Sequence, residues 1–266
     1  MAPLDQFVLF GDSITEGSHT QVRGFALAAE LQAAYVRRLD IINRGFSGYN
    51  SDHALEVVGK VLPTPEQASM KFLTIWFGAN DANKNLSMGQ FVPAERFKEN
   101  LINIIKHPVV KAHSPHIVLL TTPPFEETIL EQFREDWGYT GEVRKARDAA
   151  EYAELVREVG KETGVDVLDV WSIFMEKVGW KSGEKLPGSK ELGKNDVLSE
   201  LLYDGLHISP SGYRLVFDHL IKLIKEKWPE YRPYKMPFMT KPPPKRDQEA
   251  SELIKINEER VWEIGI

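Results

Sequence analysis

The stretch FVLFGDSIT, residues 7–15, decides the fold of this chain. Its first four residues are continuously apolar, which is typical of a β-strand buried on both faces. Gly11 then allows the backbone to turn sharply, and Ser13 follows directly after the turn. In a parallel sheet, ligands bind beyond the carboxyl ends of the strands, so a serine at this place is a candidate for chemistry. A helix N-cap is the alternative interpretation of the same serine.

Four more apolar runs of similar length follow, at residues 39–43, 72–77, 117–122 and 165–170. Between and after them, apolar residues recur at helical spacing over residues 25–38, 94–106, 142–163 and 213–228, and Ser209 with Pro210 provides a start for the last of these helices. Strands that alternate with helices predict right-handed crossovers and a parallel sheet covered on both sides. Five strands predict an α/β protein with a three-layer α/β/α, flavodoxin-like sheet, because the chain is too short for an eight-stranded barrel.

Composition excludes several classes of protein. The 266 residues carry 33 Lys and Arg against 39 Asp and Glu, a net charge of −6, so there is no basic field for nucleic acid. The absence of cysteine excludes disulfides, a thiolate nucleophile and cysteine-ligated metals. No apolar run approaches the ~20 residues of a membrane span, and the first residues do not resemble a secretory signal. We therefore expect a cytoplasmic protein.

The composition changes near Trp228. Six prolines lie between residues 229 and 246, which predicts extended chain, and residues 248–264 have partly helical spacing. We expect residues 1–228 to form the domain and residues 229–266 to form a proline-rich arm. The arm either lies across the domain or packs on a second subunit, so a homodimer stays open.

Polar residues follow other strands of the predicted sheet. Gly48 and Gly45 lie in the loop after the second strand, Asn80 with Asp81 follows the third, and Asp204-Gly-Leu-His207 precedes the last helix. Taken singly, each has a structural interpretation, as a turn or a cap. Together they fit nucleophilic catalysis: histidine titrates near working pH, and a carboxylate three residues earlier can hold its other ring nitrogen. His19 is a weaker candidate for a place in the same pocket.

The sequence motifs of α/β-hydrolases and of nucleotide-binding proteins are absent. Position 15 is Thr, so the Gly-x-Ser-x-Gly elbow of α/β-hydrolases is absent. Neither Gly-x-Gly-x-x-Gly after the first strand nor a Gly-Lys-Ser/Thr loop is present, which argues against a nucleotide-binding protein.

The four blocks together resemble the SGNH/GDSL hydrolase superfamily, over residues 5–228. Within it, the strings GDSITE (11–16), RGFSGY (44–49), FGAND (77–81) and DGLH (204–207) are similar to isoamyl acetate-hydrolysing esterases of the fungal type. The resemblance implies the three-layer fold, hydrolysis of short acyl esters, and neither a metal nor an organic cofactor.

By this resemblance, Ser13 is the nucleophile, His207 the base and then the acid, and Asp204 the residue that orients it. The backbone N–H groups of Ser13 and Gly48 and the amide of Asn80 form the oxyanion hole. Gly48 is preferred to Gly45 because of its spacing from Asn43. Asp12 and Asp81 are expected to hold the loops. Five aromatic residues are candidates for an apolar pocket wall, although core positions are favoured for two of them, Trp76 and Phe77; the five are Phe46, Tyr49, Trp76, Phe77 and Phe125.

The resemblance therefore implies a serine esterase of short-chain, chiefly acetate, esters that acts through an acyl-enzyme on a small-molecule substrate. Other acyl substrates remain as alternatives: a thioester, a lysophospholipid, an acetylated sugar, or acyl transfer to an alcohol. A non-catalytic binding protein of the same fold is the remaining alternative, although it would have no need for the complete set of polar residues.

Overall fold

A five-stranded parallel sheet lies at the centre of the molecule, in a computed structural model that describes residues 4–137, 141–233 and 235–238. The strand order is β2-β1-β3-β4-β5, and every neighbouring pair is parallel. This is the order of a flavodoxin-like sheet, so the predicted fold class is confirmed. The strands are β1 (Asp5–Gly11), β2 (Leu39–Gly45), β3 (Met70–Trp76), β4 (His116–Leu120) and β5 (Asp166–Leu168).

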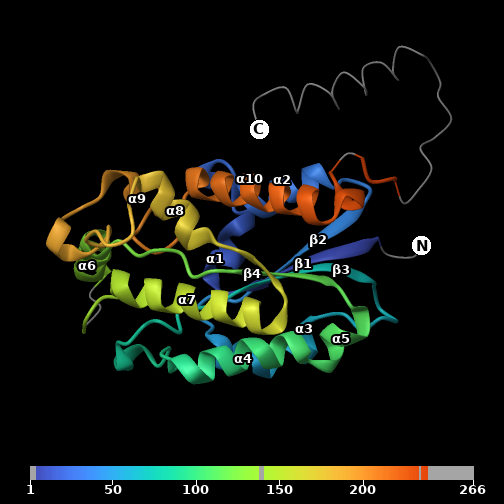
Figure 1. Ribbon diagram of the computed structural model, residues 1–266, viewed down its shortest axis with the longest axis horizontal. Coiled ribbons are helices and arrows are strands. Elements are labelled where there is room, and N and C mark those ends of the chain that lie inside the picture. Colours follow the sequence, from blue (N-terminus) through green and yellow to red (C-terminus); the bar gives the residue numbers. More distant parts are fainter. Residues whose placement is uncertain (1–3, 138–140, 234, 239–266) are drawn as a thin grey trace, which may run out of the picture.

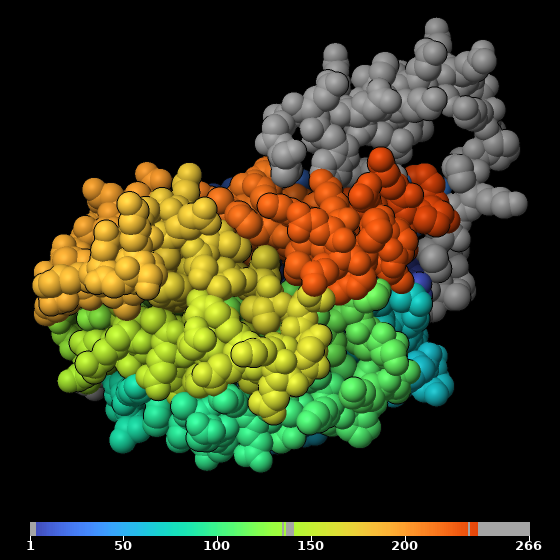
Figure 2. Space-filling view, viewed as in Figure 1, coloured from blue at the N-terminus to red at the C-terminus, as the bar shows by residue number. Residues whose placement is uncertain are grey.

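Helices cover both faces of the sheet and complete the three layers (Figure 1). One face carries α2 (Leu27–Ala34), α8 (Val170–Val178) and α10 (Pro210–Lys227). The other carries α3 (Ser51–Val61), α4 (Ala94–Lys106), α5 (Pro108–His113) and α7 (Ala146–Thr163). The short α1 (Ser13–Glu16) follows β1, and α6 (Glu127–Trp137) and α9 (Asp196–Leu201) lie toward the carboxyl end of the sheet. Figure 2 shows the same layering at the surface, with orange α10 on one side and green α4 and α5 on the other.

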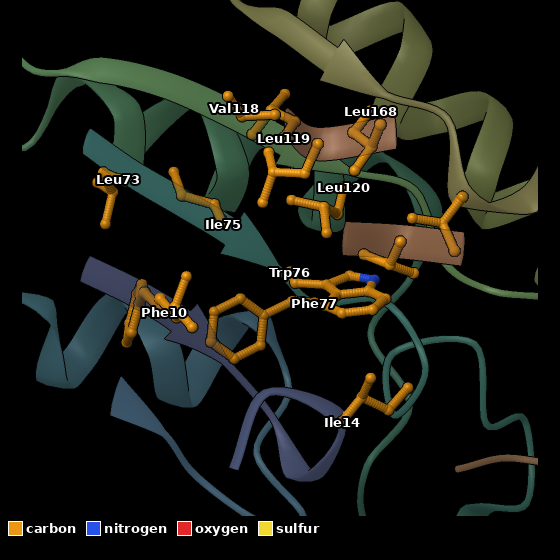
Figure 3. Close-up of a cluster of buried hydrophobic side chains, with 14 of the residues drawn as sticks. Phe10, Ile14, Leu73, Ile75, Trp76, Phe77, Val118, Leu119, Leu120 and Leu168 are labelled. Atoms are coloured by element: carbon orange, nitrogen blue, oxygen red, sulfur yellow. The ribbon is translucent and has the colours of Figure 1, made fainter. Parts of the chain in front are cut away.

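The core is centred on β1 and β3, whose apolar runs are buried almost without interruption. The rings of Phe10 and Phe77 meet edge to face at 5.0 Å, and Trp76 lies beside them (Figure 3). The indole N–H of Trp76 donates to the carbonyl of Thr121 at 3.1 Å, which ties the end of β3 to the end of β4. Burial on both faces is wrong for the edge strands: only Leu39 of β2 and Leu168 of β5 are buried, because each has a neighbouring strand on one side alone.

Helix limits follow the sequence with two differences. The helix over residues 94–106 is confirmed, and α10 begins with Ser209 as N-cap and Pro210 as its first residue. The helix expected over residues 25–38 forms only over Leu27–Ala34. The helix expected from residue 142 begins at Ala146, whose N–H donates to the Glu127 carboxylate at 2.9 Å. Residues 142–145 are therefore a loop.

The first residues after α10 lie at the amino ends of the strands. The rings of Trp228 and Tyr231 pack against Phe72 at the start of β3. The Tyr35 hydroxyl donates to the carbonyl of Tyr231 at 2.9 Å. The helix expected over residues 248–264 lies outside the described residues, and none of the helices within the described ranges is long and apolar enough to cross a membrane.

Candidate active site

Ser13 is presented by a tight turn between β1 and α1. Gly11 has no room for a side chain, because an added Cβ would lie 2.1 Å from the hydroxyl of Thr15 and 2.5 Å from the carbonyl of Trp76. Asp12 caps the helix by accepting the N–H of Ile14 at 2.8 Å. The interpretation of Ser13 as the N-cap is therefore wrong, and the Ser13 hydroxyl is available for another partner.

That partner is His207, which is far away in the chain. The Ser13 Oγ and the His207 Nε2 are 2.9 Å apart. The Tyr213 hydroxyl, from the first turn of α10, donates to the carbonyl of Ile14 at 2.6 Å and fastens the two segments together. This hydrogen bond connects the segment that follows His207 to the helix that begins with Ser13.

Asp204 holds the other side of the imidazole. Its Oδ2 lies 2.6 Å from His207 Nδ1, and its Oδ1 accepts the backbone N–H groups of His207 at 2.7 Å and Leu206 at 3.0 Å. Burial acts to raise the pKa of Asp204, but the hydrogen bonds and charge of His207 and the backbone donors outweigh burial and lower it. An ionised Asp204 keeps the proton of neutral His207 on Nδ1, which leaves Nε2 free to accept the Ser13 proton.

Three groups that are expected to form the oxyanion hole come from three different loops. Neither the Ser13 N–H nor the Gly48 N–H has a hydrogen-bond partner among the described residues. Gly48 has a φ of +81°, a conformation that favours glycine, whereas Gly45 lies within β2 and its N–H donates to Asn43. One N–H of the Asn80 amide donates to the carbonyl of Tyr49 at 2.9 Å, and a carboxamide has a second N–H to offer.

Asp12 and Asp81 are fully buried beside these groups. The Asp81 carboxylate accepts the N–H of Ser51 at 2.8 Å, which ties the loop after β3 to the start of α3. Burial raises the pKa of Asp12 to about 6 and that of Asp81 to about 7. Asp12 therefore accepts a backbone N–H within α1, and Asp81 accepts one from the start of α3.

The polar groups open into a cavity of about 490 Å³, a size typical of small-molecule sites. Its lining includes Ser13, Gly48, Asn80, Asp204 and His207. Its apolar wall is formed by Met88, Leu130, Phe133, Val143 and Leu206.

The prediction that Phe46, Tyr49 and Phe125 line an apolar pocket wall is wrong, whereas the core positions favoured for Trp76 and Phe77 are confirmed. None of the five aromatic residues lines this cavity. Trp76, Phe77 and Phe125 are buried in the core, while Phe46 and Tyr49 are partly exposed and pack against the core. His19 is exposed and contacts Asn43 at 3.0 Å, outside the cavity lining.

Several residues that line the cavity are not predicted from the sequence. The Tyr203 ring is stacked on His207 with the ring centres 5.8 Å apart, and the guanidinium of Arg23 lies 4.0 Å from the centre of the Tyr203 ring. Arg144 and Gln90 contact the loops of Asn80 and Gly48. Tyr203 is adjacent to the Asp204 block, so its position in the chain is a usable indication. Arg144 and Gln90 follow no strand and belong to no recognised block.

Within the described part of the chain, no group of three or more His, Asp or Glu side chains is placed to hold a metal ion. The groups present suit nucleophilic catalysis: a hydroxyl next to a base, and N–H donors for a negatively charged oxygen.

Comparison with known proteins adds to this geometry. The profile of the GDSL-like Lipase/Acylhydrolase family matches residues 9–215. The isoamyl acetate-hydrolyzing esterase 1 homolog of Bos taurus is 34% identical over 223 residues, covering 83% of this chain and 81% of the relative. The isoamyl acetate-hydrolyzing esterase of Saccharomyces cerevisiae is 28% identical over 244 residues, covering 89% and 93%. The solved lipase/acylhydrolase of Enterococcus faecalis has the same fold, with a TM-score of 0.57 and 23% identity over 84% of this chain and 97% of that one.

Proposed function

The chain belongs to the GDSL-like lipase/acylhydrolase family and is a carboxylic ester hydrolase; from that premise we propose that it cleaves short-chain esters, chiefly acetates of simple alcohols, through an acyl-enzyme on Ser13. The observation that carries the proposal is the continuous set of contacts from Ser13 Oγ to His207 Nε2 at 2.9 Å and from His207 Nδ1 to Asp204 at 2.6 Å. The printed names of the bovine and yeast relatives support the choice of acetate esters.

The proposed reaction begins when the Ser13 oxygen attacks the ester carbonyl carbon while His207 Nε2 takes the hydroxyl proton. The carbonyl oxygen gains negative charge and is bound by the N–H groups of Ser13, Gly48 and Asn80. As the tetrahedral intermediate collapses, the carbon–oxygen bond to the alcohol breaks, and His207 gives its proton to the departing alcohol.

Water then repeats the sequence on the acyl-enzyme. His207 removes a proton from the water as it attacks the acyl carbon, and returns that proton to the Ser13 oxygen when the carboxylic acid leaves. Asp204 stays ionised throughout and stabilises the transient imidazolium. The net reaction is ester plus water to acid plus alcohol.

The proposal is tested by the hydrolysis of p-nitrophenyl esters from acetyl to palmitoyl, measured on wild type and Ser13→Ala in parallel. We expect the wild-type rate to peak between acetyl and butyryl and the variant to lose at least ~10³-fold in kcat, as loss of a nucleophile does. Isoamyl acetate is then assayed by acid release.

Each part of the proposal has its own contrary result. A maximum at long acyl chains would contradict the short-chain assignment and leave the nucleophile intact. Undiminished hydrolysis by the Ser13→Ala variant would reject Ser13. Stronger turnover of an acyl thioester or an acetylated sugar than of simple acetates would replace the substrate class.

A further inference from the structure

The Asn80 side chain can stabilise an oxyanion only when its NH₂ group, rather than its oxygen, faces the reacting carbonyl. The two ends of a carboxamide are nearly equal in size, so neighbouring groups must determine which end is presented. Here both ends have partners: Nδ2 donates to the carbonyl of Tyr49 at 2.9 Å, and Oδ1 accepts from Nη2 of Arg144 at 3.0 Å. Because a guanidinium has donors only, a reversed amide would place NH₂ against N–H groups.

Arg144 contacts the backbone of the same loop. Its Nε donates to the carbonyl of Ala79 at 3.1 Å while its Nη2 contacts the side chain of Asn80. The planar guanidinium thus fixes two consecutive residues beyond β3 at once, a geometry that a lysine cannot reproduce. Arg144 itself comes from the loop before α7, far from β3 in the chain.

Arg144 is also connected to the Gly48 loop, through hydrogen bonds to and from Gln90. The Nη2 of Arg144 also donates to Gln90 Oε1 at 2.9 Å, as does the Asn83 amide. The Gln90 NH₂ group then donates to the carbonyl of Gly48 at 3.2 Å. The Arg144 guanidinium is therefore connected directly to the Asn80 loop and, through Gln90, to the Gly48 loop, and these two loops carry two of the three expected oxyanion donors.

The charge of Arg144 adds to its geometry. It makes no ion pair with a carboxylate among the described residues, while Asp12 and Asp204 act on it at longer range. Burial lowers the pKa of Arg144 to about 10, so the group remains a cation at neutral pH. Arg144 is half-buried and lines the cavity, and its positive charge favours negative charge on an oxygen nearby.

We propose that Arg144 is a positioning residue of the oxyanion hole: it holds the Asn80 amide with NH₂ toward the substrate and, through Gln90, keeps the Gly48 loop in register with it. The inference rests on the esterase mechanism proposed above. Since the oxyanion forms only in the transition state, loss of Arg144 should lower kcat and leave substrate binding almost unchanged.

The first test compares Arg144→Gln and Arg144→Lys with wild type on p-nitrophenyl acetate. We expect kcat to fall by about 10- to 100-fold in both variants, less than the ~10²–10³-fold cost of losing an oxyanion donor outright, with KM within about 3-fold. Arg147→Gln is the matched control, because this arginine lies three residues away with its side chain 80% exposed. Its kinetics should equal those of wild type.

A double-mutant cycle separates positioning from general damage to the fold. If Arg144 acts through Asn80, then removing Arg144 from an Asn80→Ala enzyme should cost less than about 3-fold further in kcat. Two full losses that multiply would overturn the inference, and so would a raised KM with unchanged kcat, which would make Arg144 a substrate-binding residue. Near wild-type kcat in Arg144→Gln would reject the positioning role and leave the proposed function standing. A wild-type enzyme that hydrolyses no ester would reject both.

Discussion

Asp12 and Asp81 are two buried carboxyl groups that adjoin the proposed catalytic residues Ser13 and Asn80 in the chain. Burial, and to a smaller extent the charge of Asp12, raises the pKa of Asp81 to about 7 from a usual value of 3.8. Between those two pH values the folded protein holds a proton that the unfolded chain releases. The contribution of Asp81 to the free energy of unfolding is therefore largest below pH 4 and is lost as the pH rises through about 7.

Asp81→Asn should make stability less dependent on pH. The amide retains an oxygen for the N–H of Ser51 and removes the buried negative charge. The substitution can also change stability by an amount that does not depend on pH. Between pH 5 and pH 8, the free energy of unfolding of the variant should rise relative to that of wild type by about 1–3 kcal/mol, since one pKa unit corresponds to about 1.4 kcal/mol.

The measurement is urea denaturation of both proteins at the two pH values. Asp196→Asn is the control, because that side chain is 92% exposed and its charge is solvated whether the chain is folded or not. A difference for Asp81→Asn that stayed flat with pH would contradict the buried ionisation.

At the scale of elements, the site depends on how closely α1 packs against β2. A Cβ added to Gly45 would lie 2.0 Å from the backbone nitrogen of Glu16, and backbone cannot move aside as a flexible side chain can. The Asn43 amide donates to the carbonyl of Thr15 at 2.7 Å across the same contact. The helix that begins with Ser13 is therefore located by the close approach of two backbones.

Gly45→Ala should separate α1 from β2. We expect a loss of about 1–3 kcal/mol in the free energy of unfolding, typical of overpacking, together with a lower kcat because Ser13 moves with the helix. Gly17→Ala is the matched variant: its Cβ would meet nothing closer than the Tyr213 hydroxyl at 3.6 Å, so stability should stay within about 1 kcal/mol. Equal stability of the two variants would show that the contact can relax.

The same scale shows why the sequence predicts some elements and residues better than others. The runs of β1 and β3 are apolar because both of their faces are buried, so their composition identifies them, and their alternation with helices predicts a parallel sheet. Ser13 and His207 stand in short local blocks. Arg144 does not, because it lies at the start of a segment predicted to be helical, whereas α7 begins only at Ala146, whose N–H donates to Glu127 of another element. Its contacts with Ala79 and Asn80 exist only in the folded chain.

At the scale of the whole molecule, the proposed active site and the contacts of residues 229–238 lie at opposite ends of the sheet. The proposed catalytic groups lie beyond the carboxyl ends of the strands, whereas the described residues after Trp228, 229–233 and 235–238, lie at the amino ends. There the Arg38 guanidinium donates to the carbonyl of Met236 at 2.7 Å and lies 4.2 Å from the ring centre of Phe238. Residues 229–238 should thus contribute to stability and leave the chemistry unchanged.

Truncation at two positions tests this separation. A chain that ends at Trp228 loses the contacts of Tyr231, Met236 and Phe238, and its free energy of unfolding should fall by about 1–3 kcal/mol, while a chain that ends at Phe238 keeps them. Both should retain the kcat of the full chain, since Ser13 and His207 lie at the opposite end of the sheet.

Light scattering on the same proteins tests whether the arm packs on a second subunit: a fall to the mass of one chain would assign the subunit contact to the residues removed, and an unchanged mass would reject it. If the chain that ends at Trp228 lost kcat as well as stability while the chain that ends at Phe238 kept both, the two ends of the sheet would be coupled, which would contradict this prediction.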